Sequence, residues 1–143
     1  MAEKLAWDYV YAFDPVPQQT EEFNKLSQYY KNLKAGRLTS TRCEECGEIS
    51  WPPRTVCPNC MSDRLAWTDL PEEGEIVVAT AQESGAFPGF KAPLIFGMLD
   101  FGVVRFIGKL VDIDPAQLAP GTKVRLKVET EEDGRVLPAF TPV

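Results

Sequence analysis

The chain has 143 residues, 44% of them hydrophobic, enough for one sizeable domain or a small module beside a compact one. Its 15 Lys and Arg residues stand against 21 Asp and Glu residues, a formal net charge of −6, which argues against a partner with a phosphate backbone. No window approaches ~18 consecutive apolar residues. The N-terminus, MAEKLAWDYV, lacks a basic stretch followed by an apolar run. We therefore expect a cytoplasmic protein without a membrane span.

The first predicted segment is an N-terminal arm at residues 1–19. In LAWDYVYAF the large hydrophobic residues take alternate positions, so an extended backbone gathers them on one face. Because aromatic side chains dominate interface hot spots, Trp7, Tyr9 and Tyr11 are candidates for contact with a partner protein. The alternative is an arm that packs on the chain's own fold.

A helix is predicted next, over residues 20–35. We assign the whole helical segment, including the residue that ends it, to 20–36. Thr20 suits an N-cap, and Gly36 suits the residue that ends a helix. Hydrophobic residues recur at helical spacing and form one stripe. They are Phe23, Leu26, Tyr30 and Leu33.

The stretch CEECGEISWPPRTVCPNC, at 43–60, holds every cysteine of the chain as two Cys-x-x-Cys pairs. The metal-ligand candidates are Cys43, Cys46, Cys57 and Cys60. Four thiolates favour a tetrahedral zinc site. Iron is the rival metal, and a disulfide or redox role is a further alternative, but the short gap between the pairs favours a zinc ribbon. We expect one structural zinc ion per chain in a ribbon at 37–68, with Trp51 packed on the neighbouring domain.

The zinc site is expected to be closed and non-catalytic. Catalytic zinc keeps an open position and usually has a histidine or carboxylate ligand, whereas this chain has no histidine. The same absence excludes Ser-His-Asp and Cys-His catalysis. The carboxylates of Glu83, Asp100 and Asp112 remain as acid–base candidates, but such residues are more often solvated or in turns. The sequence predicts that the chain alone is not an enzyme.

After the ribbon, the hydrophobic period changes from helical to two. Strands are expected at 73–84, 93–101, 103–111, 122–130 and 135–143. Asp114 and Pro115 predict a short helical turn between the third and fourth strands. This order is typical of an OB-fold barrel, which we assign to 69–143. The predicted fold class is mainly β with an N-terminal helix, a rubredoxin-like zinc ribbon and a five-stranded OB-fold barrel.

This pattern resembles the zinc-ribbon/OB-fold proteins that accompany thiolases and related acyl-CoA enzymes, long labelled a domain of unknown function. The residues that carry the resemblance are Cys43, Cys46, Gly47, Pro52, Pro53, Arg54, Cys57, Pro58 and Cys60, followed by Trp67 and Gly74. The resemblance covers residues 20–140. It implies a non-catalytic subunit that completes an acyl-CoA acyltransferase, with acyl-CoA at a site shared with the thiolase-like catalytic subunit. The aromatic-rich N-terminus favours a thiolase of the benzoylsuccinyl-CoA type.

With that resemblance, two further features become candidates for the CoA and acyl site. Phe87 and Phe90 lie in the loop at 84–93, where they can cap a pantetheine chain or an acyl group; the alternative is a loop folded over one barrel end. Lys123, Arg125 and Lys127, joined by Arg105 and Lys109, form a cationic row that is able to meet CoA phosphates. The alternative for this row is the solvated face of a half-buried strand.

Two other classes of function compete with the subunit hypothesis. Zinc ribbons and OB-folds also bind single-stranded nucleic acid, using stacking rings and a basic groove. The net charge of −6 argues against that alternative. A stand-alone acyl-CoA carrier or regulatory domain is the third class.

Overall fold

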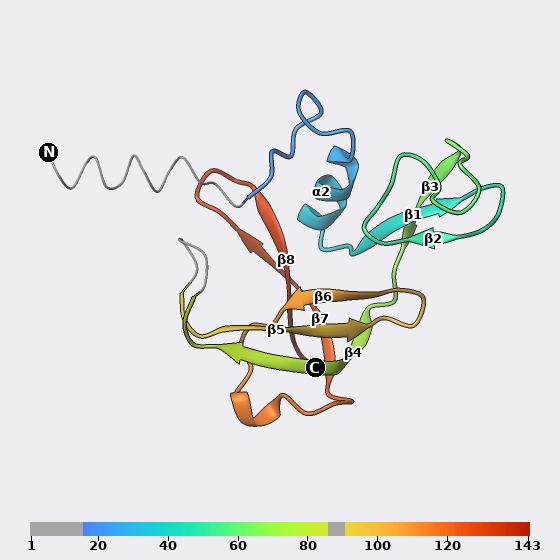
Figure 1. Cartoon of the computed structure of the whole chain (residues 1–143). Helices are drawn as coiled ribbons and strands as arrows, with labels where there is room; N and C mark the ends of the chain where they lie inside the picture. The colour runs from blue at the N-terminus through green and yellow to red at the C-terminus, as the bar shows by residue number, and fades with distance from the viewer. Residues whose placement is uncertain (1–15, 86–90) are drawn as a thin grey trace, which may run out of the picture.

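The computed structural model describes residues 16–85 and 91–143, which form one α-helix, two β-sheets and a short 3₁₀ helix (Figure 1). Helix α2 spans Ser27–Lys34. The ribbon sheet has the order β2-β1-β3, from β1 (Thr39–Cys43), β2 (Ile49–Ser50) and β3 (Leu65–Asp69). The larger sheet has the order β6-β5-β4-β7-β8, from β4 (Glu73–Gln82), β5 (Leu94–Asp100), β6 (Arg105–Lys109), β7 (Lys123–Thr130) and β8 (Val136–Pro142). Within these ranges, no helix is long and apolar enough to cross a membrane.

The five-stranded sheet curls into a half-barrel. All neighbouring strands in it are antiparallel, and a register shift between Ile76 and Val78 bends β4. Its two outer strands, β6 and β8, approach one another at a parallel bridge between Leu110 and Phe140. The short helix η1 (Pro115–Gln117) lies between β6 and β7, as predicted, and Asp114 caps it. The predicted fold class is confirmed, with the barrel present as this curled sheet.

The expected start of the helix is wrong, whereas its expected end is right. Residues 20–26 form bends and turns, and α2 begins only at Ser27. The Asn24 side chain accepts a hydrogen bond from the Leu26 backbone N–H at 2.8 Å, a local bond that competes with helix formation. Phe23 is 68% exposed, so a helix extended to include Phe23 would gain little stability from burial of this side chain. Gly36 follows the helix with φ +78°, as expected for a residue that ends one.

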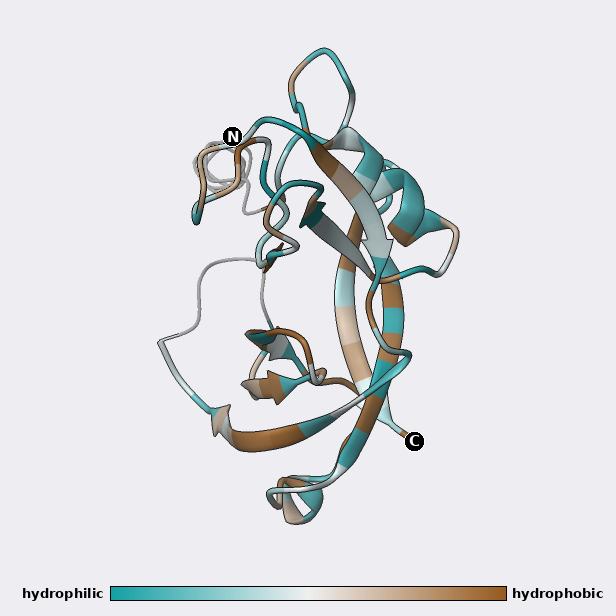
Figure 2. Cartoon of the chain, turned by 90° about the vertical axis from the view of Figure 1, so that its right-hand side faces the viewer, coloured by the Kyte–Doolittle hydropathy of each residue, from teal (hydrophilic) through white to brown (hydrophobic). Residues whose placement is uncertain are grey.

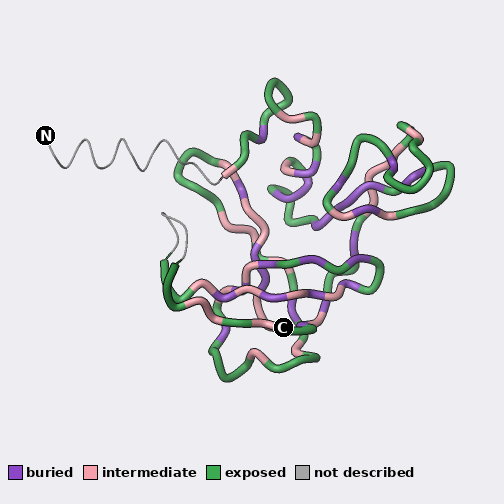
Figure 3. The backbone as a smooth tube through the Cα atoms, viewed as in Figure 1, coloured by how far each residue is buried: buried purple, intermediate pink, exposed green. Residues whose placement is uncertain are grey.

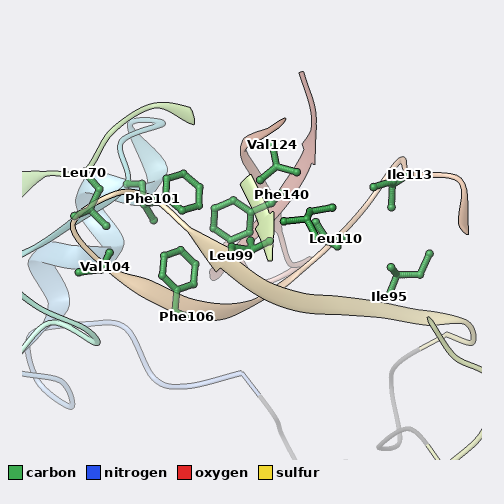
Figure 4. Close-up of a cluster of buried hydrophobic side chains, with 12 residues drawn as sticks. Leu70, Ile95, Leu99, Phe101, Val104, Phe106, Leu110, Ile113, Val124 and Phe140 are labelled. Atoms are coloured by element: carbon green, nitrogen blue, oxygen red, sulfur yellow. The ribbon is translucent and has the colours of Figure 1, made fainter. Parts of the chain in front are cut away.

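The core of the half-barrel is a group of phenylalanine and aliphatic side chains (Figure 4). Phe101, Phe140 and Leu99 are fully buried in it. Gly108 sits beside them, where a Cβ atom would lie 2.7 Å from Leu99 Cδ1, so a larger residue there would displace core atoms. Buried positions alternate with intermediate and exposed ones along the strands of the large sheet, whereas the connecting turns are mainly exposed (Figure 3). Hydrophobic residues likewise lie along the strands of the large sheet, whereas α2 is mainly hydrophilic (Figure 2).

Trp51 joins the ribbon to the half-barrel, as expected from the sequence. Its ring stacks on Phe106, with the ring centroids 4.3 Å apart and the planes at 22°. It also meets the edge of Tyr29 of α2 at a centroid distance of 6.1 Å. Offset stacked and edge-to-face rings are favourable aromatic geometries, so one side chain ties the ribbon to both the helix and the barrel core.

We expect Trp51→Ala to lower the free energy of unfolding by roughly 3 kcal/mol. This value is at the low end for the deletion of a large aromatic side chain, because Trp51 is only half-buried. Trp51→Phe keeps a ring against Phe106, and as a matched control it should lose only about 1 kcal/mol. Urea denaturation followed by circular dichroism measures both changes. A wild-type free energy of unfolding in Trp51→Ala would contradict the role of Trp51 in holding the ribbon on the half-barrel.

Candidate functional site

The four cysteine sulfur atoms converge at one end of the ribbon. The Sγ atoms of Cys43 and Cys60 are 3.5 Å apart, and those of Cys46 and Cys57 are 3.6 Å apart. All four sulfurs lie within 4.8 Å of one another. These separations exceed the ~2.05 Å of a disulfide bond. A tetrahedron of sulfurs at ~2.3 Å from zinc has edges of about 3.8 Å, so the arrangement fits a four-sulfur zinc site.

Two similar knuckles of backbone position the sulfurs. In the first, the Gly47 N–H donates to the Cys43 carbonyl at 3.0 Å, and in the second the Met61 N–H donates to the Cys57 carbonyl at 3.0 Å. Both turns need a left-handed residue, and the φ values are +78° at Gly47 and +63° at Met61. Glycine takes this conformation freely. The same turn therefore repeats around both pairs, with methionine at the glycine position of the second.

Each knuckle contributes one buried and one exposed thiol. Cys43 and Cys57 are buried, whereas Cys46 and Cys60 are exposed. Hydrogen bonds with the Asn59 side chain and the Glu48 backbone lower the pKa of Cys46 to about 6. The pKa of Cys60 is shifted in both directions. A hydrogen bond with the Ser62 backbone lowers this pKa, but the contact of Cys60 with the Cys43 sulfur and the desolvation of its thiol raise the pKa to about 12. The thiols therefore do not all ionise at neutral pH by themselves, and metal binding must release protons.

With its four sulfur ligands, the site is closed, so a bound zinc ion would have no open position for water or substrate. Its role would be to hold the two knuckles and the end of β1 together. Two of the three carboxylates considered as acid–base candidates have structural contacts instead, and the third, Glu83, is exposed. Asp100 accepts a hydrogen bond from the Gly102 N–H. This bond and a second one from Arg105 lower the pKa of Asp100. Asp112 pairs with Lys127.

The cationic row is largely neutralised by carboxylates from other strands. Lys123 pairs with Glu75 at 3.2 Å, and Lys109 pairs with Glu129 at 2.8 Å. Within residues 16–85 and 91–143, Arg125 has no ion pair. The row is therefore not a continuous basic strip, and the charge that remains available on it lies at Arg125.

Several predicted site residues lie outside the described part of the chain. Phe87 and Phe90 belong to residues 86–90, and Trp7, Tyr9 and Tyr11 belong to residues 1–15. Their assignment to the acyl site and to the partner interface stays a prediction.

An apolar surface that was not predicted from the sequence lies on the outer face of β4, β5 and β6. Val78, Met98 and Ile107 stand opposite one another across these strands, because Val78 pairs with Met98 and Met98 with Ile107. The exposed fractions are 62% for Val78 and 68% for Ile107. With Phe96 they line a shallow cavity of about 210 Å³. We call these four residues the outer apolar patch. The signal was present in LIFGMLD, which is apolar at almost every position and not only at alternate ones.

Comparison with known proteins supports the ribbon assignment. Residues 31–66 match the family model described as ChsH2, rubredoxin-like zinc ribbon domain. The chain is 26% identical over 121 residues to a DUF35 domain-containing scaffold protein of Pyrococcus furiosus, covering 79% of this chain and 88% of that protein. It is 26% identical over 102 residues to benzoylsuccinyl-CoA thiolase subunit BbsA of Thauera aromatica, covering 71% of this chain and 70% of that protein.

Solved structures share the fold. A chain of the Ltp2-ChsH2(DUF35) aldolase superimposes with a TM-score of 0.73 at 21% identity, covering 91% of this chain and 98% of that chain. A DUF35-family protein of unknown function from Sulfolobus solfataricus gives a TM-score of 0.55 at 14% identity, covering 81% of this chain and 83% of that chain. The matches confirm the predicted resemblance to zinc-ribbon DUF35 accessory proteins.

Elemental analysis of the purified chain should find about one zinc ion per chain. Cys57→Ser should lose the metal and destabilise the ribbon, because it removes a buried ligand. Val56→Ser, at the neighbouring exposed position, is the control and should keep the metal. A folded wild-type protein without zinc, or one that holds a redox-active iron instead, would contradict the assignment.

Proposed function

We propose that the chain is the non-catalytic, zinc-containing subunit of a thiolase- or aldolase-like acyl-CoA complex. Two of the matches support this proposal by name: BbsA is a benzoylsuccinyl-CoA thiolase subunit, and a similar fold occurs in the Ltp2-ChsH2(DUF35) aldolase. The closed four-sulfur site provides no open metal position for a substrate. In such a complex the catalytic residues belong to the partner.

The observation that carries the proposal is the outer apolar patch. A water-facing sheet surface is normally polar, yet here aliphatic side chains occupy the outward positions of three adjacent strands. Fully burying one such side chain contributes about 1.5–3 kcal/mol. Contiguous exposed apolar surface of this kind marks a site of protein–protein contact. We assign it to the thiolase-like subunit.

The finer parts of the proposal concern the shared acyl-CoA site and the arm. Phe87 and Phe90 would present two rings to the acyl or pantetheine portion. Among the cationic candidates Arg125 is better suited than Lys123 to meet an anionic group, because Lys123 already pairs with Glu75. Trp7, Tyr9 and Tyr11 would add aromatic contacts to the partner interface.

The isolated chain should show no acyl-CoA turnover, because the chemistry lies in the partner. A tagged copy expressed in the native host should co-purify with a protein of thiolase size, and mixing that protein with this chain should give the full activity. Acyl-CoA turnover by the chain alone would contradict the proposal, and so would full activity of the partner alone. Co-purified nucleic acid in place of a protein would favour the rival class.

Ile107→Asp should weaken assembly with the co-purified partner by about tenfold or more, since a charge in a buried apolar contact costs more than ~1.4 kcal/mol. The outward position of Ile107 predicts a folded variant. Val103→Asp is the control, because Val103 is 54% exposed in the turn before β6 and does not line the patch cavity. Surface plasmon resonance compares the two variants. Equal binding by both would contradict the role of the patch.

A further inference from the structure

The two knuckles of the cysteine site are supported differently by the rest of the ribbon. The first knuckle is the hairpin turn between β1 and β2, because Cys43 ends β1 and Ile49 begins β2. Within this turn the Glu44 N–H donates to the Arg64 carbonyl at 3.0 Å, which continues the pairing of β1 with β3. The ribbon sheet therefore holds the first knuckle from both sides without the help of the cysteine sulfurs.

The second knuckle lies in residues 55–63, an irregular stretch between β2 and β3 that we call the second-knuckle loop (Figure 1). Within residues 16–85 and 91–143, its backbone hydrogen bonds stay inside the loop: the Cys57 N–H donates to the Ser62 carbonyl, and the Met61 N–H donates to the Cys57 carbonyl. Cys57 is buried and Ser62 is half-buried, whereas the other residues of the loop are exposed. Burial therefore contributes little to ordering this loop, and ligation of Cys57 and Cys60 must offset the lost backbone entropy.

Both ends of the second-knuckle loop are fixed to the ribbon sheet. The Arg54 N–H donates to the Thr41 Oγ1 atom of β1 at 2.9 Å, just before the loop begins. The Arg64 carbonyl, just after the loop ends, accepts the hydrogen bond from Glu44. The loop is thus closed at its base, and it can open locally without breaking the sheet or the contact between ribbon and half-barrel.

The second knuckle also holds backbone strain that the first knuckle lacks. The left-handed position of the turn is Gly47 in the first knuckle, at φ +78°, and Met61 in the second, at φ +63°. A Cβ atom in this conformation crowds the following carbonyl oxygen, a cost that glycine avoids. A Cβ atom at Gly47 would meet only Arg42 Nη2, at 3.8 Å, so the first knuckle has room for a side chain and the difference lies in the backbone. Met61 is 74% exposed, so burial of its side chain does not offset the strain.

We propose that the second-knuckle loop opens as one unit and forms the path by which a metal ion enters and leaves the site. Cys57 and Cys60 would separate from the ion together, while Cys43 and Cys46 stay in place on the sheet. The strain at Met61 is present in the closed loop and released in the open loop, so it speeds the loss of the metal. Order in this loop would accordingly depend on zinc, whereas the ribbon sheet and the half-barrel would stay folded without it.

The first test measures zinc release from the full-length, zinc-loaded chain to an excess of the chromogenic chelator pyridylazoresorcinol. Met61→Gly should slow release about fivefold, because glycine removes the cost of a left-handed Cβ atom but adds flexibility to the open loop. Met61→Ala is the matched control, since it removes the same exposed side chain but keeps the Cβ atom. This control should release zinc at the wild-type rate.

Gly47→Ala tests the first knuckle, because it places a left-handed Cβ atom there. It should leave the rate of zinc release unchanged, since the first knuckle stays formed while the metal leaves. A wild-type rate in Met61→Gly would overturn the proposal. So would release from Gly47→Ala that is faster by the factor by which Met61→Gly is slower, or release from Met61→Ala that is as slow as from Met61→Gly.

The second test removes zinc with EDTA and follows amide hydrogen exchange by NMR. The chain offers two matched reporters, because the Cys43 N–H donates to the Glu48 carbonyl and the Cys57 N–H donates to the Ser62 carbonyl, each at 2.8 Å. Without zinc, the Cys57 amide should exchange freely, whereas the Cys43 amide should stay protected. Loss of protection at both amides, or protection of both, contradicts an opening confined to the second knuckle. Neither test involves the partner, so failure of this proposal and failure of the subunit hypothesis give different results.

Discussion

The stack of Trp51 on Phe106 connects the parts of this structure. Phe106 belongs to the phenylalanine group inside the half-barrel, where it also stacks on Phe101 at a centroid distance of 5.4 Å. Trp51 lies between the two knuckles of the ribbon, so the same contact sets where the metal site stands relative to the barrel. Tyr29 brings the helix to the same ring. A ribbon too small for a core of its own thus gains one by sharing the core of its neighbour.

The roles that we assign to the molecule lie on different parts of this frame. The candidate metal site lies in the knuckles of the ribbon, where four sulfurs would close the coordination shell of a bound ion. The outer apolar patch belongs to β4, β5 and β6.

Electrostatics in this acidic chain act locally. The formal net charge is −6, and Lys109, Lys123 and Lys127 on the strands are each paired with a carboxylate from another part of the chain. Exposed pairs of this kind contribute little stability, but they do remove the cations from ligand binding.

Local signals in the sequence were enough to predict that the four cysteines gather at one site, and to predict the strands of the large sheet, the η1 turn at Asp114 and Pro115, and the end of the helix at Gly36. Each depends on residue spacing or on the conformational preference of one residue. The start of the helix and the pairing of Lys123 with Glu75 were decided by tertiary structure. They depend on which distant segments meet: Glu75 and Lys123 are 48 positions apart in the chain but lie opposite one another on β4 and β7. A pattern of spacing carries no information on such neighbours, because they exist only after the sheet has formed.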